Sequence, residues 1–489
     1  MFESSRPFAF FDYFRVPYET VSGVGPLAQP VARLKRADAG TAEPSLCWLP
    51  ATSSGTLPGR ASRLGRYRLN DFTLVGHVLT DDPTPMLATL GTGWRPAEPI
   101  ADARGKTVNT VWRDDQGSVF LPFDPGEVMH HLWSERYTKV GSAALLGIPR
   151  KAAVRGYYVI RPLLPRRIQL ALRRVLARRQ RLPTFPTWPL EPSLHDLYAW
   201  LFETVTAVAG CPVPWLDPWP DGKLWAFVLT HDVETSVGRA DMALLRDVER
   251  LHGYRSSWNF VPERYDVDEP TLQSLRDDGC EIGVHGLRHD GRDLASRRLL
   301  DERLPAIREH ADKWGAVGFR SPATQRAWDL MPRLGFDYDS SYTDTDPYEP
   351  QPGGCCTYLP FFNERMVELP ITLPQDHTVF QILQHTDGAL WTGKARDIRD
   401  RGGMVLVLAH PDYARDQRMA LAWKQLLEEF AEDPTVWQAL PREVAAWWRR
   451  RDGSSILPDG EGWAVCGPAA DQARIRLTTY VSTPATVES

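Results

Sequence analysis

The chain contains two regions in which short apolar runs alternate with polar connections, and the runs of the two regions differ in character. In residues 1–150 the runs lie between connections rich in proline, glycine and aspartate, which is typical of strands in a small α/β or α+β domain. These runs lie at 46–49, 72–75, 108–112 and 119–122. We find no chemical motif in this separate amino-terminal domain, and its role is left open.

The region 222–451 alternates continuously apolar runs with helical patterns. The apolar runs lie at 225–230, 257–261, 281–284, 318–319, 367–369 and 404–409. The helical patterns include 239–252, 270–278, 294–313 and 325–333. Apolar strands between helices predict an α/β fold with a parallel sheet that is buried on both faces. Polar residues at the carboxyl ends of such strands meet at one edge of the sheet.

A basic helix and a proline-rich linker separate these regions, at 151–221. Between the arginines of this segment, apolar residues repeat at helical spacing: Ile168, Leu172, Val175 and Leu176. The stretch 166–181 therefore predicts a basic amphipathic helix. Such a helix either packs between domains or attaches to an anionic membrane surface or a phosphorylated substrate. A second helical pattern lies at 193–208, and the chain ends in a short carboxy-terminal extension, 452–489.

Composition and charge limit the classes of protein to which this chain can belong. The chain has 489 residues, of which 43% are hydrophobic, enough for folded cores. Its net charge of −5 argues against a nucleic-acid partner. Its six cysteines form no CxxC pair and no disulfide framework, as expected in a reducing compartment. The amino terminus lacks the pattern of a signal peptide, and no apolar run approaches the ~18–20 residues of a membrane span. We therefore expect a cytoplasmic protein without a transmembrane segment, for which peripheral membrane contact stays open.

Four short polar signatures follow the apolar runs of the region 222–451. They are THDVE at 230–234, HGLRH at 285–289, RSP at 320–322 and AHP at 409–411. The i, i+4 spacing of His285 and His289 predicts that both imidazoles lie on one face of a helix or helical turn. Together with an acidic third ligand they would hold a divalent cation. Two histidines, a carboxylate and open positions for water and substrate are typical of a metal-dependent hydrolase.

The order of these signatures resembles that of the polysaccharide deacetylase (NodB-homology) domain, carbohydrate esterase family 4. The motifs of that family are a TFDD-like acid pair, HxxxH, RxP, an Asp-containing fourth motif and LxxHP, and this chain offers THDVE, HGLRH, RSP, YDSSY and LVLAHP. The stretch 339–361 further looks like the subgroup with an extra amino-terminal domain. The resemblance implies a distorted (β/α) barrel of about seven strands. It also implies one divalent ion, zinc or another first-row metal, and removal of an acetyl group from an N-acetylated sugar or glycan precursor.

The resemblance also implies a role for each motif residue. Asp232 matches the general base, and Arg320 matches the arginine that holds this base by a charge-assisted hydrogen bond. His410 matches the general acid that protonates the leaving nitrogen. His285 and His289 match the two histidine ligands of the metal.

One position departs from the family pattern. Val233 stands where the second acid would hold the metal, and its side chain cannot ligate. Glu234 is the nearest replacement, because alternate residues of an extended strand share a face, and Asp232 and Glu234 are two apart. We assign Glu234 to the metal. Asp232 itself and His231 remain alternative ligands.

The fourth motif and the sugar contacts are less well defined. Three acids of the stretch are candidates for tuning His410 or binding substrate: Asp339, Asp344 and Asp346. Four aromatic residues are candidates for stacking on a sugar ring: Tyr342, Tyr348, Trp391 and Tyr413. Cys355 and Cys356 are expected to be loop thiols and not ligands.

Two other functions fit the same motifs. Hydrolases of this fold that act on a non-sugar C–N bond, as the allantoinase-like relatives do, share a loop like the one at 339–361. A catalytically defective glycan-binding protein is the second alternative, because Val233 replaces an acid and Ala323 and Thr324 stand where the family often has an aromatic residue. Release of acetate separates the deacetylase from both.

Overall fold

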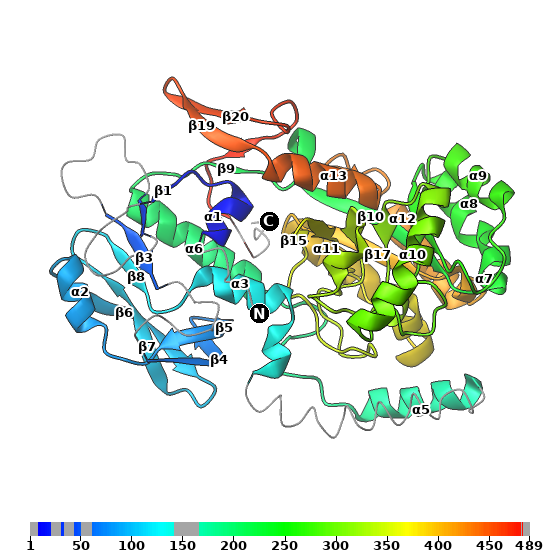
Figure 1. Ribbon diagram of the computed structural model, residues 1–489, viewed down its shortest axis with the longest axis horizontal. Coiled ribbons are helices and arrows are strands. Elements are labelled where there is room, and N and C mark those ends of the chain that lie inside the picture. Colours follow the sequence, from blue (N-terminus) through cyan, green and yellow to red (C-terminus); the bar gives the residue numbers. More distant parts are fainter. Residues whose placement is uncertain are drawn as a thin grey trace. The chain divides into compact units, whose positions relative to one another are not determined.

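A computed structural model describes residues 8–20, 31–33, 44–49, 61–140, 166–480 and 482, and the chain divides into two compact units (Figure 1). Unit 1 consists of Met1–Ile148, Pro192–Asp217 and Arg450–Thr483. Unit 2 consists of Pro149–Glu191, Pro218–Arg449 and Pro484–Ser489. The division differs from the four predicted segments, since parts of the linker and of the carboxy-terminal extension belong to unit 1.

Unit 1 is built on a sheet of eight described strands in the order β1-β2-β3-β8-β7-β6-β4-β5. All neighbouring pairs are antiparallel except β3 and β8. The strands are β1 (Glu19–Thr20), β2 (Val31–Arg33), β3 (Leu46–Trp48), β4 (Ser62–Leu69), β5 (Phe72–Leu79), β6 (Arg95–Asp102), β7 (Thr107–Arg113) and β8 (Val119–Leu121). The helices are α1 (Ala9–Phe14), α2 (Thr84–Leu90), α3 (Pro125–Trp133) and α6 (Ser193–Ala209).

Two strand pairs bring later parts of the chain into unit 1. The strand β9 (Trp215–Leu216) pairs with β21 (Ile475–Arg476), and β19 (Ser455–Asp459) pairs with β20 (Gly462–Cys466). The helix α6 lies against β5 and buries residues on most of its circumference. Burial of this apolar surface explains why the segment is part of a core and not a linker.

Unit 2 contains a sheet of nine described strands in the order β15-β16-β14-β13-β12-β11-β10-β17, with β18 paired to β10. Every pair is parallel except β15 and β16. The strands are β10 (Trp225–Val233), β11 (Ser256–Phe260), β12 (Glu281–Val284), β13 (Gly318–Phe319), β14 (Tyr338–Asp339), β15 (Phe361–Asn363), β16 (Met366–Glu368), β17 (Met404–Ala409) and β18 (Val436–Gln438). The predicted α/β class with a buried parallel sheet is confirmed for this unit.

The sheet of unit 2 curls, so that the segment after β16 reaches the strand at the opposite end of the order. The Thr372 N–H donates to the Leu406 carbonyl at 3.1 Å, and the Leu406 N–H donates to Thr372 Oγ1 at 2.8 Å. Leu406 belongs to β17. A curled sheet of parallel strands is consistent with the predicted barrel.

Helices connect the strands of unit 2, and Figure 1 shows α8, α10, α11 and α12 around β10 and β17. They are α5 (Arg166–Arg179), α7 (Ser236–Asp241), α8 (Ala243–Leu251), α9 (Glu269–Asp277), α10 (Arg297–Trp314), α11 (Ala389–Asp400) and α12 (Gln417–Phe430), and α13 (Pro441–Asp452) continues from unit 2 into unit 1. The prediction of a helix at 325–333 is wrong, since only the 3-10 turn η5 (Met331–Leu334) forms there. None of the helices in the described residues combines the length and the apolar character needed to cross a bilayer.

Candidate active site

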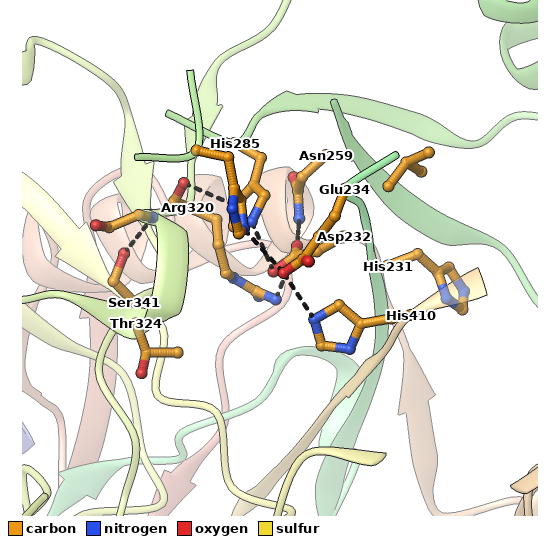
Figure 2. Close-up of polar contacts among 12 residues, drawn as sticks. His231, Asp232, Glu234, Asn259, His285, Arg320, Thr324, Ser341 and His410 are labelled. Carbon is orange, nitrogen blue, oxygen red and sulfur yellow. Dashed lines mark hydrogen bonds and ion pairs between the residues drawn. The ribbon is translucent and has the colours of Figure 1, made fainter. Parts of the chain in front are cut away.

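The motif residues lie where the parallel strands of unit 2 end. Asp232 is at the end of β10, His285 directly follows β12, Arg320 follows β13 and His410 follows β17. The carboxyl ends of parallel strands share one edge of a sheet, and Figure 2 shows these side chains pointing toward one another. Residues separated by up to 178 positions, such as His231 and Ala409, are thereby in hydrogen-bond contact.

Three side chains at this edge of the sheet form a group that suits a metal ion, called the metal-type group below. The ligand atoms of Glu234, His285 and His289 all lie within 4.8 Å of one another. His289 Nε2 is 2.8 Å from Glu234 Oε1. His285 Nδ1 is 3.1 Å from the Arg320 carbonyl, so that it carries the proton, and His285 Nε2 is buried without a hydrogen-bond partner among the described residues. Burial lowers the pKa of His285 to about 4, which keeps the imidazole in the neutral form that binds metals.

The two histidines lie in a loop, so the helix or helical turn predicted for them is wrong. Gly286 and His289 both adopt left-handed backbone conformations, with φ of 63° and 55°. A Cβ atom on Gly286 would lie 2.6 Å from Pro322 Cδ, so only glycine fits there. The sharp turn brings the ring centroids of His285 and His289 to 5.1 Å. The predicted proximity is present, but a strained loop and not helical spacing produces it.

The Asp232 carboxylate is buried and held by two side chains. Its Oδ1 accepts hydrogen bonds from Asn259 Nδ2 at 2.9 Å and from Arg320 Nη1 at 3.4 Å, and its Oδ2 lies 3.7 Å from His285 Nε2. Burial alone would raise the pKa of Asp232, but its interactions with His285 and with the Arg320 guanidinium hold that pKa below the ordinary value. Asp232 is therefore an oriented, ionised carboxylate next to the metal-type group.

Glu234 follows Asp232 by two residues but has different partners. Burial alone would raise the pKa of the Glu234 carboxyl, but the ion pair and hydrogen bond with His289 hold it well below the ordinary value. The Glu234 N–H donates to Asp412 Oδ2 at 3.3 Å, and Asp412 also accepts from the Thr235 hydroxyl. These contacts fix the backbone that aims the Glu234 side chain at the histidines.

His410 is paired with an acid that the sequence did not reveal. His410 Nδ1 lies 2.6 Å from Asp376 Oδ1, and the His410 N–H donates to Asp376 Oδ2 at 2.7 Å. Burial alone would lower the pKa of His410, but the Asp376 carboxylate outweighs it and raises the pKa to about 10. His410 Nε2 is 3.8 Å from Glu234 Oε1. The imidazolium therefore points its second N–H toward the metal-type group.

The three acids that were candidates for adjusting the pKa of His410 contact other residues instead. Asp339 accepts hydrogen bonds from the Ser341 N–H and hydroxyl at 2.8 and 2.7 Å, and Asp344 forms an ion pair with Lys394 at 2.7 Å. Asp346 accepts from the Tyr348 N–H at 2.7 Å. Asp376 lies 34 residues before His410, beyond any local motif, which explains why spacing alone did not identify it.

His231 points away from the site, as Figure 2 shows. Its Nε2 lies 2.8 Å from Glu249 Oε1, and its ring stacks on Trp258 with centroids 4.1 Å apart. It is therefore a packing histidine, and the alternative that it ligates the metal does not agree with this geometry.

Two of the four aromatic residues predicted to stack on a sugar are buried, and the other two are partly exposed. Tyr342 and Trp391 have exposed fractions of 2% and 0%, and Tyr348 packs against Trp188. Tyr413 lies next to His410, with ring centroids 5.7 Å apart, and is partly exposed. Tyr413 is therefore the best placed of the four to contact a substrate near His410.

Comparisons with known proteins were made for sequence and for structure. No protein-family profile matches this chain, and no curated protein matches its sequence. Solved structures match about half of it, and they include polysaccharide deacetylases and family 4 carbohydrate esterases, the group that the motifs resemble.

Three of these structures illustrate the match. PuuE allantoinase is 17% identical, with 48% of this chain and 93% of that chain covered and a TM-score of 0.39. The peptidoglycan deacetylase PdaC from Bacillus subtilis is 14% identical, with 48% and 96% covered and a TM-score of 0.29. A family 4 acetyl xylan esterase from Clostridium thermocellum, in complex with a cobalt ion, is 14% identical, with 45% and 90% covered and a TM-score of 0.32.

Proposed function

We propose that the chain is a metal-dependent hydrolase that removes an acetyl group from an N-acetylated sugar or glycan precursor. One observation carries the proposal: three metal-type ligands, a held carboxylate and a carboxylate-paired histidine converge at one edge of the sheet. Glu234, His285 and His289 are the proposed ligands, and zinc is the proposed ion, since two imidazoles and one carboxylate with an open position are a typical catalytic zinc set. Bound there, the ion would polarise the acetyl carbonyl and lower the pKa of a neighbouring water.

Asp232 is the proposed general base. A water that attacks the acetyl carbon must lose a proton, and Asp232 Oδ2 is the oxygen without a bond to Asn259 or Arg320. Its lowered pKa keeps it ionised, and Arg320 is itself held by Ser340 Oγ at 2.7 Å and Thr230 Oγ1 at 3.1 Å. An ionised, oriented carboxylate accepts the proton without reorganising.

His410 is the proposed general acid. Cleavage of the C–N bond leaves an amine nitrogen that needs a proton, and the His410 imidazolium carries one on Nε2. Asp376 accepts from the opposite nitrogen of the ring and so fixes both its orientation and its charge. The products are acetate and a free amine.

A backbone donor for the tetrahedral oxyanion is proposed in the turn after Arg320. Pro322 has no N–H, and the Ser321 N–H already donates to Ser341 Oγ at 2.8 Å. Ala323 is the remaining residue of this stretch, and its left-handed conformation, with φ of 53°, turns the backbone sharply. Its N–H is the proposed oxyanion donor.

Acetate release tests the proposal. The purified protein, loaded with zinc, is incubated with N-acetylglucosamine oligomers, and acetate and free amine are measured together. We expect both products in equal amounts, loss of activity on chelation and recovery with added zinc. The His285→Ala variant is the matched negative control. Acetate formation that survives both chelation and this substitution would refute a metal-dependent reaction at this site.

A second candidate, hydrolysis of a non-sugar C–N bond, is favoured by the burial of Tyr342 and Trp391, which leaves fewer aromatic residues to stack on a sugar. Allantoin is the probe for this candidate. Turnover of allantoin without acetate release from any sugar would select it.

We also propose that the protein works in the cytoplasm and that its substrate is a precursor of a glycan. None of the six cysteines, all of which lie in the described residues, forms a disulfide, which is typical of proteins in a reducing compartment. An enzyme placed there would act on a free, nucleotide-linked or polyprenyl-linked acetylated sugar.

A further inference from the structure

The helix α5 of unit 2, which is labelled in Figure 1, carries apolar residues whose side chains are exposed. The exposed fractions of its apolar residues are 47% for Ile168, 44% for Leu172, 48% for Val175 and 65% for Leu176. Their i, i+4, i+7, i+8 spacing places them on one face of the helix. Within unit 2, the described residues therefore leave this apolar stripe uncovered.

The opposite face of α5 is fastened to unit 2. Arg173 donates to the Tyr348 carbonyl at 3.2 Å, Arg174 donates to the Gln381 carbonyl at 2.9 Å, and Gln180 donates to the Pro347 carbonyl at 2.9 Å. A helix held by three such bonds cannot roll its apolar stripe inward without breaking them. The stripe therefore stays outward in this arrangement.

The charge on the exposed side of α5 is entirely positive. Arg178, Arg179 and Arg181 are exposed, and the structure records no ion pair for them within its described residues. Arg179 follows Val175 by four residues and so lies on the apolar stripe itself. The helix contains no acidic residue, although the whole chain has a net charge of −5.

The attachment points of α5 lie on segments that lead into the candidate active site. Gln381 belongs to η6 (His377–Ile382), and the residue that caps η6 is Asp376, the partner of His410. Pro347 and Tyr348 directly precede Glu349, a buried acid that accepts a hydrogen bond from Thr378 at 3.2 Å. The helix α5 is thus attached to the segment that begins next to Asp376, the partner of His410.

We propose that α5 docks unit 2 on an anionic lipid surface, with the apolar stripe among the acyl chains and the arginines at the lipid phosphates. A helix with apolar and arginine side chains on one exposed face is typical of binding in the plane of a membrane interface. Guanidinium groups that have no ion pair among the described residues match anionic headgroups, which attract basic residues near the surface. If the proposed function is right, the substrate would be an acetylated sugar carried on a membrane lipid. That consequence rests on the proposed function, whereas the docking surface does not.

Vesicle flotation of the full chain tests the docking surface. The vesicles contain phosphatidylcholine alone or phosphatidylcholine with phosphatidylglycerol, at low and high ionic strength. We expect flotation with the anionic vesicles only, weakened by salt because exposed charges are screened. Arg178→Gln with Arg179→Gln should reduce the affinity roughly 30-fold, and Leu172→Ser with Leu176→Ser should also release the protein.

Matched variants elsewhere on unit 2 serve as controls. Arg297→Gln with Arg298→Gln makes the same charge change on α10, and Leu244→Ser with Leu251→Ser removes two exposed leucines from α8. Both should float as the unsubstituted protein does. The proposal is overturned if the unsubstituted protein ignores anionic vesicles, or if the α5 variants float equally well. The proposal is also overturned if no vesicle binding is seen and the protein is instead a dimer that dissociates when Leu172 and Leu176 are substituted.

Acetate release separates this proposal from the proposed function. With a small soluble acetylated sugar, the α5 variants should retain the unsubstituted rate, since α5 lies outside the catalytic residues. With an acetylated glycolipid embedded in anionic vesicles, the same variants should be slower by about the loss in vesicle affinity. Vesicle binding without any acetate release would refute the proposed function and leave the docking surface standing.

Discussion

Asp232 and Glu234 are separated by one residue, yet their partners indicate different roles. Asp232 contacts Asn259 and Arg320, whereas Glu234 contacts His289. We expect Asp232→Asn to retain the metal and lose turnover, and Glu234→Gln to weaken metal affinity by roughly 10–100-fold or more. Zinc titration with parallel turnover measurements checks both variants. Metal loss in the Asp232 variant and not in the Glu234 variant would exchange the two roles.

His410 tests whether the site has a separate general acid. His410→Ala removes the imidazolium but none of the three proposed ligands, so the metal content should not change. Removal of a general acid is expected to lower kcat by about 10²–10⁴-fold. Steady-state kinetics and elemental analysis of the same preparation check this prediction. An unsubstituted rate in the variant would refute the assigned role.

Asp376 should control the pH at which His410 loses its proton. The Asp376 carboxylate raises the pKa of His410, and the general acid works only while it is protonated, so turnover falls as pH rises through that pKa. Asp376→Asn removes the negative charge and lowers the pKa of His410. The alkaline fall of kcat/KM should therefore begin at a lower pH than in the unsubstituted protein. Asp247→Asn on the exposed surface of α8 is the control, and identical profiles for all three proteins would contradict the pairing.

At the scale of single residues, the sequence predicted the residues that stand in motifs, including Arg320, and did not indicate two residues outside the motifs that contact them. His285, Arg320 and His410 directly follow an apolar run, and Asp232 lies two residues beyond one, which is a local signal. Asn259 and Asp376 support them through contacts made across the sheet, 27 and 34 residues away along the chain. No spacing rule reports such contacts.

At the scale of elements, the loop after β12 holds the metal-type group together. Gly286→Ala should destabilise the protein by about 1–3 kcal/mol, because a side chain there is strained by its backbone conformation and meets Pro322. Metal affinity should fall with it, since His285 and His289 flank the turn. Gly253→Ala is a matched control, with φ of 73° and open space around the added Cβ. Chemical unfolding of both variants measures the difference in the free energy of unfolding. Equal losses in the two variants would show that the contact with Pro322 does not contribute to the effect.

Most of the strands and helices predicted for unit 2 form, and one predicted helix, at 325–333, does not. The strands β12, β13 and β17 form at the predicted positions, because continuously apolar runs are buried on both faces of a parallel sheet. The pattern at 325–333 was interpreted as a helix, but Ala323 and Thr324 just before it adopt left-handed conformations that redirect the chain. The local pattern did not contain that information.

At the scale of the whole molecule, unit 1 is assembled from three separate parts of the chain, which no local pattern indicated. Arg451 is buried and donates hydrogen bonds to the carbonyls of Tyr13, Leu216 and Asp217 at 2.6, 2.9 and 3.0 Å. One side chain thus joins segments more than 400 residues apart. Such long-range contacts explain why the division into units differs from the segments predicted along the sequence.

The central claim is that Glu234, His285 and His289 hold one divalent ion, and metal content measures it most directly. The purified protein, His285→Ala and the control His310→Ala on α10 are exposed to zinc, dialysed and submitted to elemental analysis. The account predicts about one ion per chain in the unsubstituted protein and in the control, and none in His285→Ala. Equal metal content in all three proteins, or no ion in the unsubstituted protein, would contradict it.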